Sequence, residues 1–176
     1  YNLEAVPHRW AYQGERRRRR ESVRLAGQRR LHGSPDAVWS ALFDPDRLCR
    51  CIPGCRRMRR LDADHYEAVL NLPIPLLHGE YVAKVTAFDQ QAPDHCQISL
   101  TSETGFGQVC ADGALSLRAM GAATVLNFEG TVELGKLTAG GRLGIGGRLL
   151  AAPARALLER FFACLDSSLT SGYQGG

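Results

Sequence analysis

The chain has 176 residues, 44% of them hydrophobic, and its 22 Lys and Arg against 18 Asp and Glu give a net charge of +4 at pH 7. This is enough apolar sequence for one domain with its own core, and no apolar run approaches the roughly 20 residues that a membrane-spanning helix needs. No signal peptide is visible, so we expect a cytoplasmic protein whose six cysteines stay reduced.

The positive charge is concentrated at the N-terminus. Residues 1–30 hold nine Arg and three Glu, a net charge of +6, which leaves −2 for residues 31–176. Residues 1–21 have neither helical nor strand periodicity and include five consecutive arginines, so we expect a disordered basic arm. Such an arm suits contact with nucleic acid, acidic lipid or an acidic partner, but we favour a poorly ordered leader.

A short strand and two short helices are the first ordered elements. The strand is expected around Val23–Leu31. Ser34 is a favourable N-cap and Pro35 suits the first helical position, so a helix begins there and ends before Pro45. A second short helix follows over Asp46–Ile52, and the Pro-Gly pair after it stops the helix.

The middle of the chain alternates between apolar and other residues with a period of two, the pattern of strands with one covered face. The runs follow one another without a helical pattern between them, which predicts an antiparallel meander. The residues expected to face inward are Tyr66, Ala68, Leu70, Leu72, Tyr81, Ala83, Val85, Ala87, Cys96, Ile98, Leu100, Val109, Ala111, Gly113, Leu115, Leu117, Leu126, Phe128, Gly130, Val132 and Leu134.

After Gly140–Gly141 the apolar residues change to a helical repeat, which predicts one long amphipathic C-terminal helix. Pro153 removes one backbone hydrogen bond and is expected to bend or restart this helix. The chain therefore divides into the arm 1–21, a domain over 22–169 and a flexible tail over 170–176. The fold class is α+β: a curved antiparallel sheet wrapped around the C-terminal helix, with two short helices after the first strand.

Many of the inward residues are small, among them Ala68, Ala83, Ala111, Gly113 and Gly130. A curved sheet lined by small residues either leaves a cavity beneath the helix or lets the helix pack closely. We favour the cavity, and close packing remains the alternative.

Several motifs resemble one known family. They are Gly33 to Pro45 (GSPDAVWSALFDP), Cys51-Ile52-Pro53-Gly54-Cys55, Tyr66-Glu67-Ala68, the strand end Val132 to Leu137, and Phe161 to Leu165. Together they resemble the family of the carbon monoxide dehydrogenase G subunit, which belongs to the START-like (SRPBCC) helix-grip superfamily, over about residues 24–168. The Cys-Ile-Pro-Gly-Cys element is the most specific of them.

The resemblance implies an accessory protein with no catalytic residue and no cofactor, which assists a molybdenum hydroxylase such as carbon monoxide dehydrogenase. It also implies an apolar pocket for a quinone or another lipid, and peripheral contact with the inner face of the cytoplasmic membrane. Two alternatives remain: a polyketide cyclase/aromatase of the same superfamily, and nucleic-acid binding through the basic arm.

The predicted pocket combines the inward face of the sheet with the apolar face of the long helix. Its lining residues are expected to be Trp39, Phe43, Ile52, Pro53, Tyr66, Leu70, Tyr81, Val85, Ile98, Val109, Leu115, Phe128, Leu143, Leu149, Leu150, Leu157 and Phe161. Tyr66 and Tyr81 are the only inward aromatic residues with a hydroxyl, so they either donate a hydrogen bond to a ligand carbonyl or serve as ordinary core tyrosines.

The close spacing of Cys49, Cys51 and Cys55 suggests a metal site with thiolate ligands, but a tetrahedral site needs a second ligand pair that the sequence lacks. We therefore expect no metal. Cys51, Gly54 and Cys55 are interpreted instead as a turn at the pocket mouth.

Charged residues are expected outside the pocket. The strand glutamates, such as Glu67, Glu129 and Glu133, fall on the outward phase, which argues against acid–base catalysis inside. The glycine-rich start of the long helix lacks the Lys-Ser/Thr of a phosphate loop and is expected to act as a lid-like entry. The arginines expected to contact a membrane or a partner are Arg56, Arg57, Arg59, Arg60, Arg142 and Arg148.

Overall fold

Seven strands and three helices make up the part of the chain that the computed structural model describes, residues 21–74, 79–104, 107–134 and 146–171. In chain order they are β1 (Glu21–His32), α1 (Pro35–Leu42), α2 (Pro45–Cys51), β2 (Cys55–Arg60), β3 (His65–Leu70), β4 (Tyr81–Gln91), β5 (His95–Thr104), β6 (Gly107–Met120), β7 (Ala123–Leu134) and α3 (Gly146–Ser171). The predicted basic arm and residues 172–176 lie outside these residues, apart from Glu21, which begins β1.

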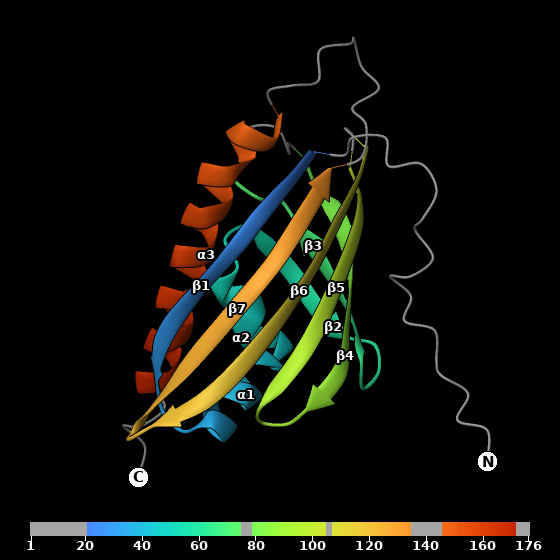
Figure 1. Cartoon of the computed structure of the whole chain (residues 1–176). Helices are drawn as coiled ribbons and strands as arrows, with labels where there is room; N and C mark the ends of the chain where they lie inside the picture. The colour runs from blue at the N-terminus through green and yellow to red at the C-terminus, as the bar shows by residue number, and fades with distance from the viewer. Residues whose placement is uncertain (1–20, 75–78, 105–106, 135–145, 172–176) are drawn as a thin grey trace, which may run out of the picture.

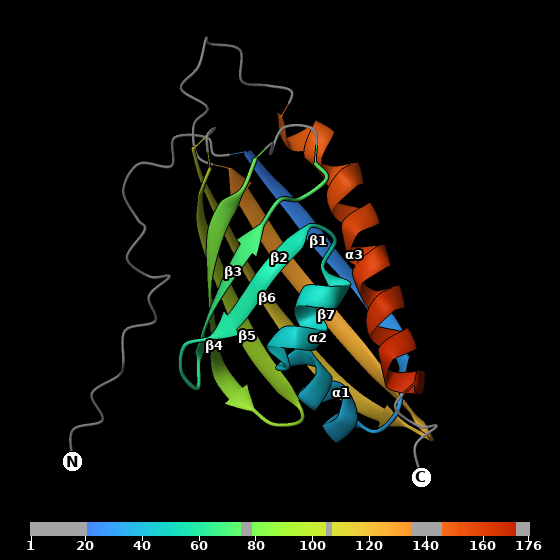
Figure 2. The ribbon, with the colours of Figure 1, turned by 180° about the vertical axis from the view of Figure 1, so that it is seen from behind.

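The strands form one antiparallel sheet in the order β1-β7-β6-β5-β4-β3-β2. Tyr66 of β3 lies opposite Val85, which lies opposite Leu100, and the same row continues through β6 and β7. Each member of this row was expected to face inward, so the predicted phase of the strands is confirmed. The sheet curves, with α3 along its β1 side and α1 and α2 across the concave face (Figures 1 and 2). The predicted fold class is confirmed.

The caps of the short helices are those expected from their sequences. The Ser34 hydroxyl accepts a hydrogen bond from the Ala37 N–H at 3.3 Å, and Pro35 is the first residue of α1. Asp44 caps α2 in the same way, accepting from the N–H groups of Asp46 and Arg47. These caps satisfy backbone donors that no earlier helical turn can pair.

Strand β2 was not predicted. Its sequence, CRRMRR, carries four arginines in six residues, so no apolar alternation marked it as a strand. Its pairing with β3 places Met58 opposite Ala68 and Arg60 opposite Tyr66, both on the inward phase. Arg57 and Arg59 lie on the opposite phase.

Of the bend or restart predicted at Pro153, the restart does not occur, because α3 continues through this residue as one helix. It ends at Ser171, two residues beyond the predicted domain boundary. Two side-chain contacts attach it to β1: Arg29 pairs with Glu159, and the Asp166 carboxylate accepts a hydrogen bond from the His32 N–H at 2.7 Å. These contacts hold the helix against one edge of the sheet.

Candidate ligand-binding site

The core is divided into two clusters of buried side chains that lie at the two ends of α3. One cluster contains Leu150 of α3 together with Leu70 and Ala83 of the sheet. The other contains Phe162 and Leu165 of α3, with neighbours from α1, β1, β6 and β7. Leu150 and Phe162 are twelve residues apart, which corresponds to about 18 Å along a helix.

The concave face between the two clusters is apolar but incompletely covered. Val85, Ile98, Ala111, Gly113 and Leu115 lie there on the inward phase, belong to neither buried cluster and are only half-buried. We call these five residues the inner strip. Ala87 and Cys96, which lie opposite Ile98 and Leu115, are buried, so the incomplete cover concerns the inner strip itself. A fully packed core would bury these five residues as well.

Two glycines on neighbouring strands leave part of the concave face at the inner strip without side chains. Gly113 of β6 lies directly opposite Gly130 of β7. A Cβ at Gly130 would come within 2.8 Å of the Asp112 carbonyl oxygen, and one at Gly113 within 3.0 Å of that of Glu129. The backbone at Gly130 therefore has no room for a side chain and that at Gly113 has little, and both positions leave this part of the concave face without side chains.

Two buried hydroxyl groups lie on the same face. Tyr66 is 5% exposed and Tyr81 is 9% exposed, and neither hydroxyl has a well-formed hydrogen bond to another described residue. Burial raises the pKa of Tyr81 to about 12, against a smaller lowering by the nearby Leu72 backbone. It also raises the pKa of Tyr66, although the charge of Arg60 acts in the opposite direction. Both side chains are therefore neutral hydrogen-bond donors at physiological pH.

Aromatic side chains surround Tyr66. The rings of Phe43 and Tyr66 have centroids 6.4 Å apart, and Trp39 packs on Phe43 at 4.8 Å. Phe43 caps the C-terminus of α1, so this short helix brings both aromatic residues to the concave face. Trp39, Phe43 and Tyr66, which the sequence assigned to one pocket, do lie together.

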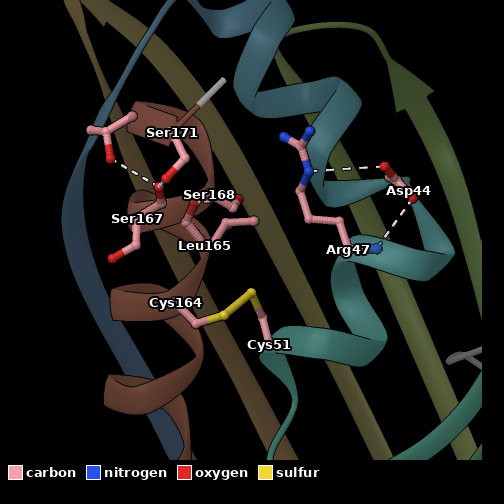
Figure 3. The surroundings of a disulfide bond; sticks show 9 residues. Asp44, Arg47, Cys51, Cys164, Leu165, Ser167, Ser168 and Ser171 are labelled. Atoms are coloured by element: carbon pink, nitrogen blue, oxygen red, sulfur yellow. Dashed lines mark hydrogen bonds and ion pairs between the residues drawn. A yellow bond between two sulfur atoms is a disulfide. The ribbon is translucent and has the colours of Figure 1, made fainter. Parts of the chain in front are cut away.

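The Cys51–Cys164 disulfide is the largest departure from the sequence-based expectations. Figure 3 shows it between the last residue of α2 and the C-terminal part of α3. The two Cα atoms are 5.2 Å apart. The expectation that all six thiols stay reduced is wrong for these two residues. A metal site of Cys49, Cys51 and Cys55 does not fit either, because the Cys51 sulfur is bonded to Cys164.

The turn after α2 is held tightly by the backbone. The Cys55 N–H donates to the Ile52 carbonyl at 3.0 Å, and the Asn71 N–H donates to the Gly54 carbonyl at 2.8 Å. Gly54 has φ of +83°, and a Cβ there would collide with the Asn71 carbonyl oxygen. Burial and the neighbouring Cys49 raise the pKa of the Cys55 thiol to about 12. This turn is a rigid connection, with Ile52 packed against the first buried cluster.

The other predicted pocket residues are distributed over both clusters. Leu70, Tyr81, Val109 and Leu150 belong to the first cluster, and Ile52 and Leu157 pack against it; Phe128 and Phe161 pack against the second. Pro53 is half-buried in the turn. Leu143 and Arg142, together with the side chains of Leu149 and Arg148, lie outside the described residues.

Sequence reasoning missed two cations on the inward phase. Arg29 of β1 lies 5.8 Å from the ring centres of both Phe128 and Phe162, besides its pairing with Glu159. Arg60 is exposed, as expected of the surface arginines with which it was grouped, but it lies on the inward phase, 5.4 Å from the ring centre of Tyr66. For Arg60 a signal existed: it is two residues from Met58 in a strand whose alternate residues face the same side.

The fold is shared with many solved structures. A conserved protein from Geobacillus kaustophilus is 30% identical, with a TM-score of 0.74 over 85% of this chain and 96% of that one. A START superfamily protein from Mycobacterium smegmatis is 11% identical, with a TM-score of 0.61 over 84% and 97% of the two chains. The comparison with curated proteins gives no match. The chain is therefore a START-like protein in its fold.

A third similar structure is the di-domain aromatase/cyclase StfQ of the steffimycin biosynthetic pathway. It is 13% identical with a TM-score of 0.63, and 86% of this chain aligns with 52% of that one. At this identity the likeness concerns the fold alone.

Family membership follows from the sequence itself. The model of the CoxG family, which is described as the G subunit of carbon monoxide dehydrogenase, matches residues 27–170, and the chain belongs to this family. The resemblance identified from the Cys-Ile-Pro-Gly-Cys element is thus confirmed. In the described residues, no helix combines the length and the apolar character that crossing a membrane requires.

Proposed function

We propose that the chain is a non-catalytic accessory protein that binds a lipophilic molecule, a quinone or another lipid, on the inner strip. The main support is a difference in burial along the concave face: the side chains of the two clusters are buried, whereas the five residues of the inner strip are only half-buried. A ligand that covered this area would gain about 25 cal/mol for each Å² of apolar surface removed from water. The hydroxyls of Tyr66 and Tyr81 supply donors for its polar groups.

Association with a molybdenum hydroxylase of the carbon monoxide dehydrogenase type is the second part of the proposal. Its support is the family description, which names a subunit of that enzyme. The accessory role also agrees with the outward position of the strand carboxylates: Glu67 lies opposite Lys84 on the outer phase and binds Arg59 at 2.8 Å. Acid–base chemistry on the concave face would require such groups to point inward.

The outer face of β2 supplies a surface for contact with an anionic membrane. Arg57 is exposed on that face, Arg56 is exposed at the adjacent register shift, and the charge of Arg59 is paired with Glu67. Each arginine near an anionic bilayer contributes about 1 kcal/mol. Flotation with vesicles that contain 30% phosphatidylserine is expected to weaken when Arg56 and Arg57 are both replaced by Gln. Equal flotation of the variant and of the unaltered protein would remove the membrane contact from the proposal.

A titration with a short-tailed quinone tests the ligand site. Trp39, close to the strip through Phe43, reports binding by fluorescence quenching in a Trp10→Phe background. Val85→Phe fills the inner strip, and Val82→Phe makes the same change on the outer face of the same strand, where Val82 is 45% exposed. We expect saturable quenching that Val85→Phe weakens at least tenfold and Val82→Phe leaves unchanged. Quenching that is equal in all three proteins would contradict a site on the inner strip.

A further inference from the structure

Arg60 and Tyr66 lie side by side on the concave face at the β2 side of the sheet. They are opposite one another in the pairing of β2 with β3, and the Arg60 guanidinium carbon is 5.4 Å from the Tyr66 ring centre. The next residue in the same row is Val85, the first member of the inner strip. A polar pair therefore borders the apolar surface directly.

The Arg60 guanidinium has only hydrogen-bond donors, and the Tyr66 hydroxyl donates well and accepts weakly. Arg60 forms no ion pair within the described residues, since the carboxylate of Glu67 is bound by Arg59. Asp64, whose charge also acts on Tyr66, accepts a hydrogen bond from Gln90 at 2.8 Å. The buried Tyr66 hydroxyl likewise has no well-formed hydrogen bond. Tyr66 is 5% exposed whereas Arg60 is exposed to solvent, so within the pair only the phenol is a buried donor without an acceptor. Such a donor is costly, and a ligand that reaches it meets the solvated Arg60 guanidinium beside it.

An oxygen that carries negative charge satisfies both groups best. Hydrogen bonds from a guanidinium to a carboxylate are shorter and roughly twice as strong as those between neutral groups, and a phenol donates to the same oxygen. The Phe43 ring lies beside Tyr66, which is 5% exposed, so competition from water is lowered at the Tyr66 hydroxyl, while Arg60 stays at the solvent boundary.

We propose that Arg60 and Tyr66 form a head-group site for the carboxylate of an amphiphile whose apolar chain lies along the inner strip. This rests on the proposed function, because it takes the inner strip as the place of the apolar chain, and it names the class of ligand: an acidic lipid with a single carboxylate. The Tyr66 hydroxyl and the Arg60 guanidinium donate to the carboxylate oxygens, and Phe43 packs beside the head group.

Binding of dodecanoate and dodecanol separates the head group from the chain. The two probes have the same chain length, and isothermal titration measures their affinities below the micellar concentration. We expect dodecanoate to bind about tenfold or more tightly than dodecanol. Arg60→Gln is expected to remove this preference, and Tyr66→Phe to weaken dodecanoate binding several-fold. Arg57→Gln is the matched control, since it removes the same charge from the outer phase of the same strand and is expected to leave the affinities for dodecanoate and dodecanol unchanged.

Three results would overturn the head-group site. They are equal binding of dodecanoate and dodecanol, a preference that survives Arg60→Gln, and an equal loss in Arg57→Gln, which would indicate long-range attraction only. In each case an apolar ligand still binds and the proposed function stands. If neither probe binds and the quinone titration also fails, both proposals fall. Circular dichroism and thermal unfolding establish that each variant is folded.

Discussion

The disulfide between α2 and α3 gives the sharpest prediction about stability. Cys51 and Cys164 are separated by 113 residues in sequence, so their bond closes a long loop in the unfolded chain. The chain-entropy relation gives about 4.8 kcal/mol of stabilisation at 25 °C for a loop of this size. For a domain of 150 to 250 residues this corresponds to a shift of roughly 10–20 °C in Tm.

Urea unfolding with and without a reductant measures this contribution. We expect the reduced protein to unfold at a lower urea concentration and to match the Cys51→Ala/Cys164→Ala variant, which should not respond to the reductant. Cys49→Ala is the control, since Cys49 is a free thiol two residues from Cys51. A midpoint for the oxidised protein that is unaffected by the reductant and equal to that of the double variant would refute the reasoning.

Three further predictions concern single residues. Gly54→Ala should destabilise the fold by more than about 2 kcal/mol in urea unfolding, because φ is +83° and the added Cβ collides with the Asn71 carbonyl. Gly121→Ala is the control: with φ of +61° and open space around it, it should cost about 1 kcal/mol, and equal losses in the two variants would contradict the role of the collision. Burial raises the pKa values of Cys55 and Cys96 to about 12 and about 11, so both thiols should resist iodoacetamide at pH 8 in the folded protein, and fast labelling of Cys96 would show that its thiol is accessible. After unfolding, mass spectrometry should count four labelled cysteines without reductant and six with it. The pKa of Tyr81 is about 12 in the folded state and near 10 when unfolded, so its contribution to the free energy of unfolding is complete below pH 10 and is lost between pH 10 and 12. Relative to Tyr81→Phe, the unaltered protein should lose about 1 kcal/mol of stability between pH 9 and 11. Parallel pH profiles of the two proteins would argue against a buried hydroxyl.

The sheet could be predicted from sequence because its inward residues are held to a strict alternation. Tyr66, Ala68 and Leu70 face the core, and a shift of one residue would expose all three, so burial fixes the register and the pattern together. The helix caps were equally local: Ser34 and Pro35 act within one turn, and the structure places them as expected. Features that depend on a few neighbouring residues can thus be predicted from the sequence.

Other parts of the site depend on contacts between distant segments. Cysteine spacing carries no information about a partner 113 residues away, so the bond from Cys51 to Cys164 could not be deduced. Strand β2 was missed because it pairs at the edge of the sheet with charged residues on both phases. The inward position of Arg60 could be inferred from Met58, two residues earlier, only once β2 is recognised as a strand. The division of the core into two clusters arises from the placement of α3, which no local pattern encodes.

The most direct test of a ligand on the inner strip is native mass spectrometry of protein purified from a membrane-containing lysate. We expect a bound apolar molecule of a few hundred daltons in the unaltered protein and in Val82→Phe, and its absence from Val85→Phe. An unaltered protein that carries no such molecule and takes up neither quinone nor dodecanoate afterwards would contradict the account, because the middle of the concave face would then hold no ligand.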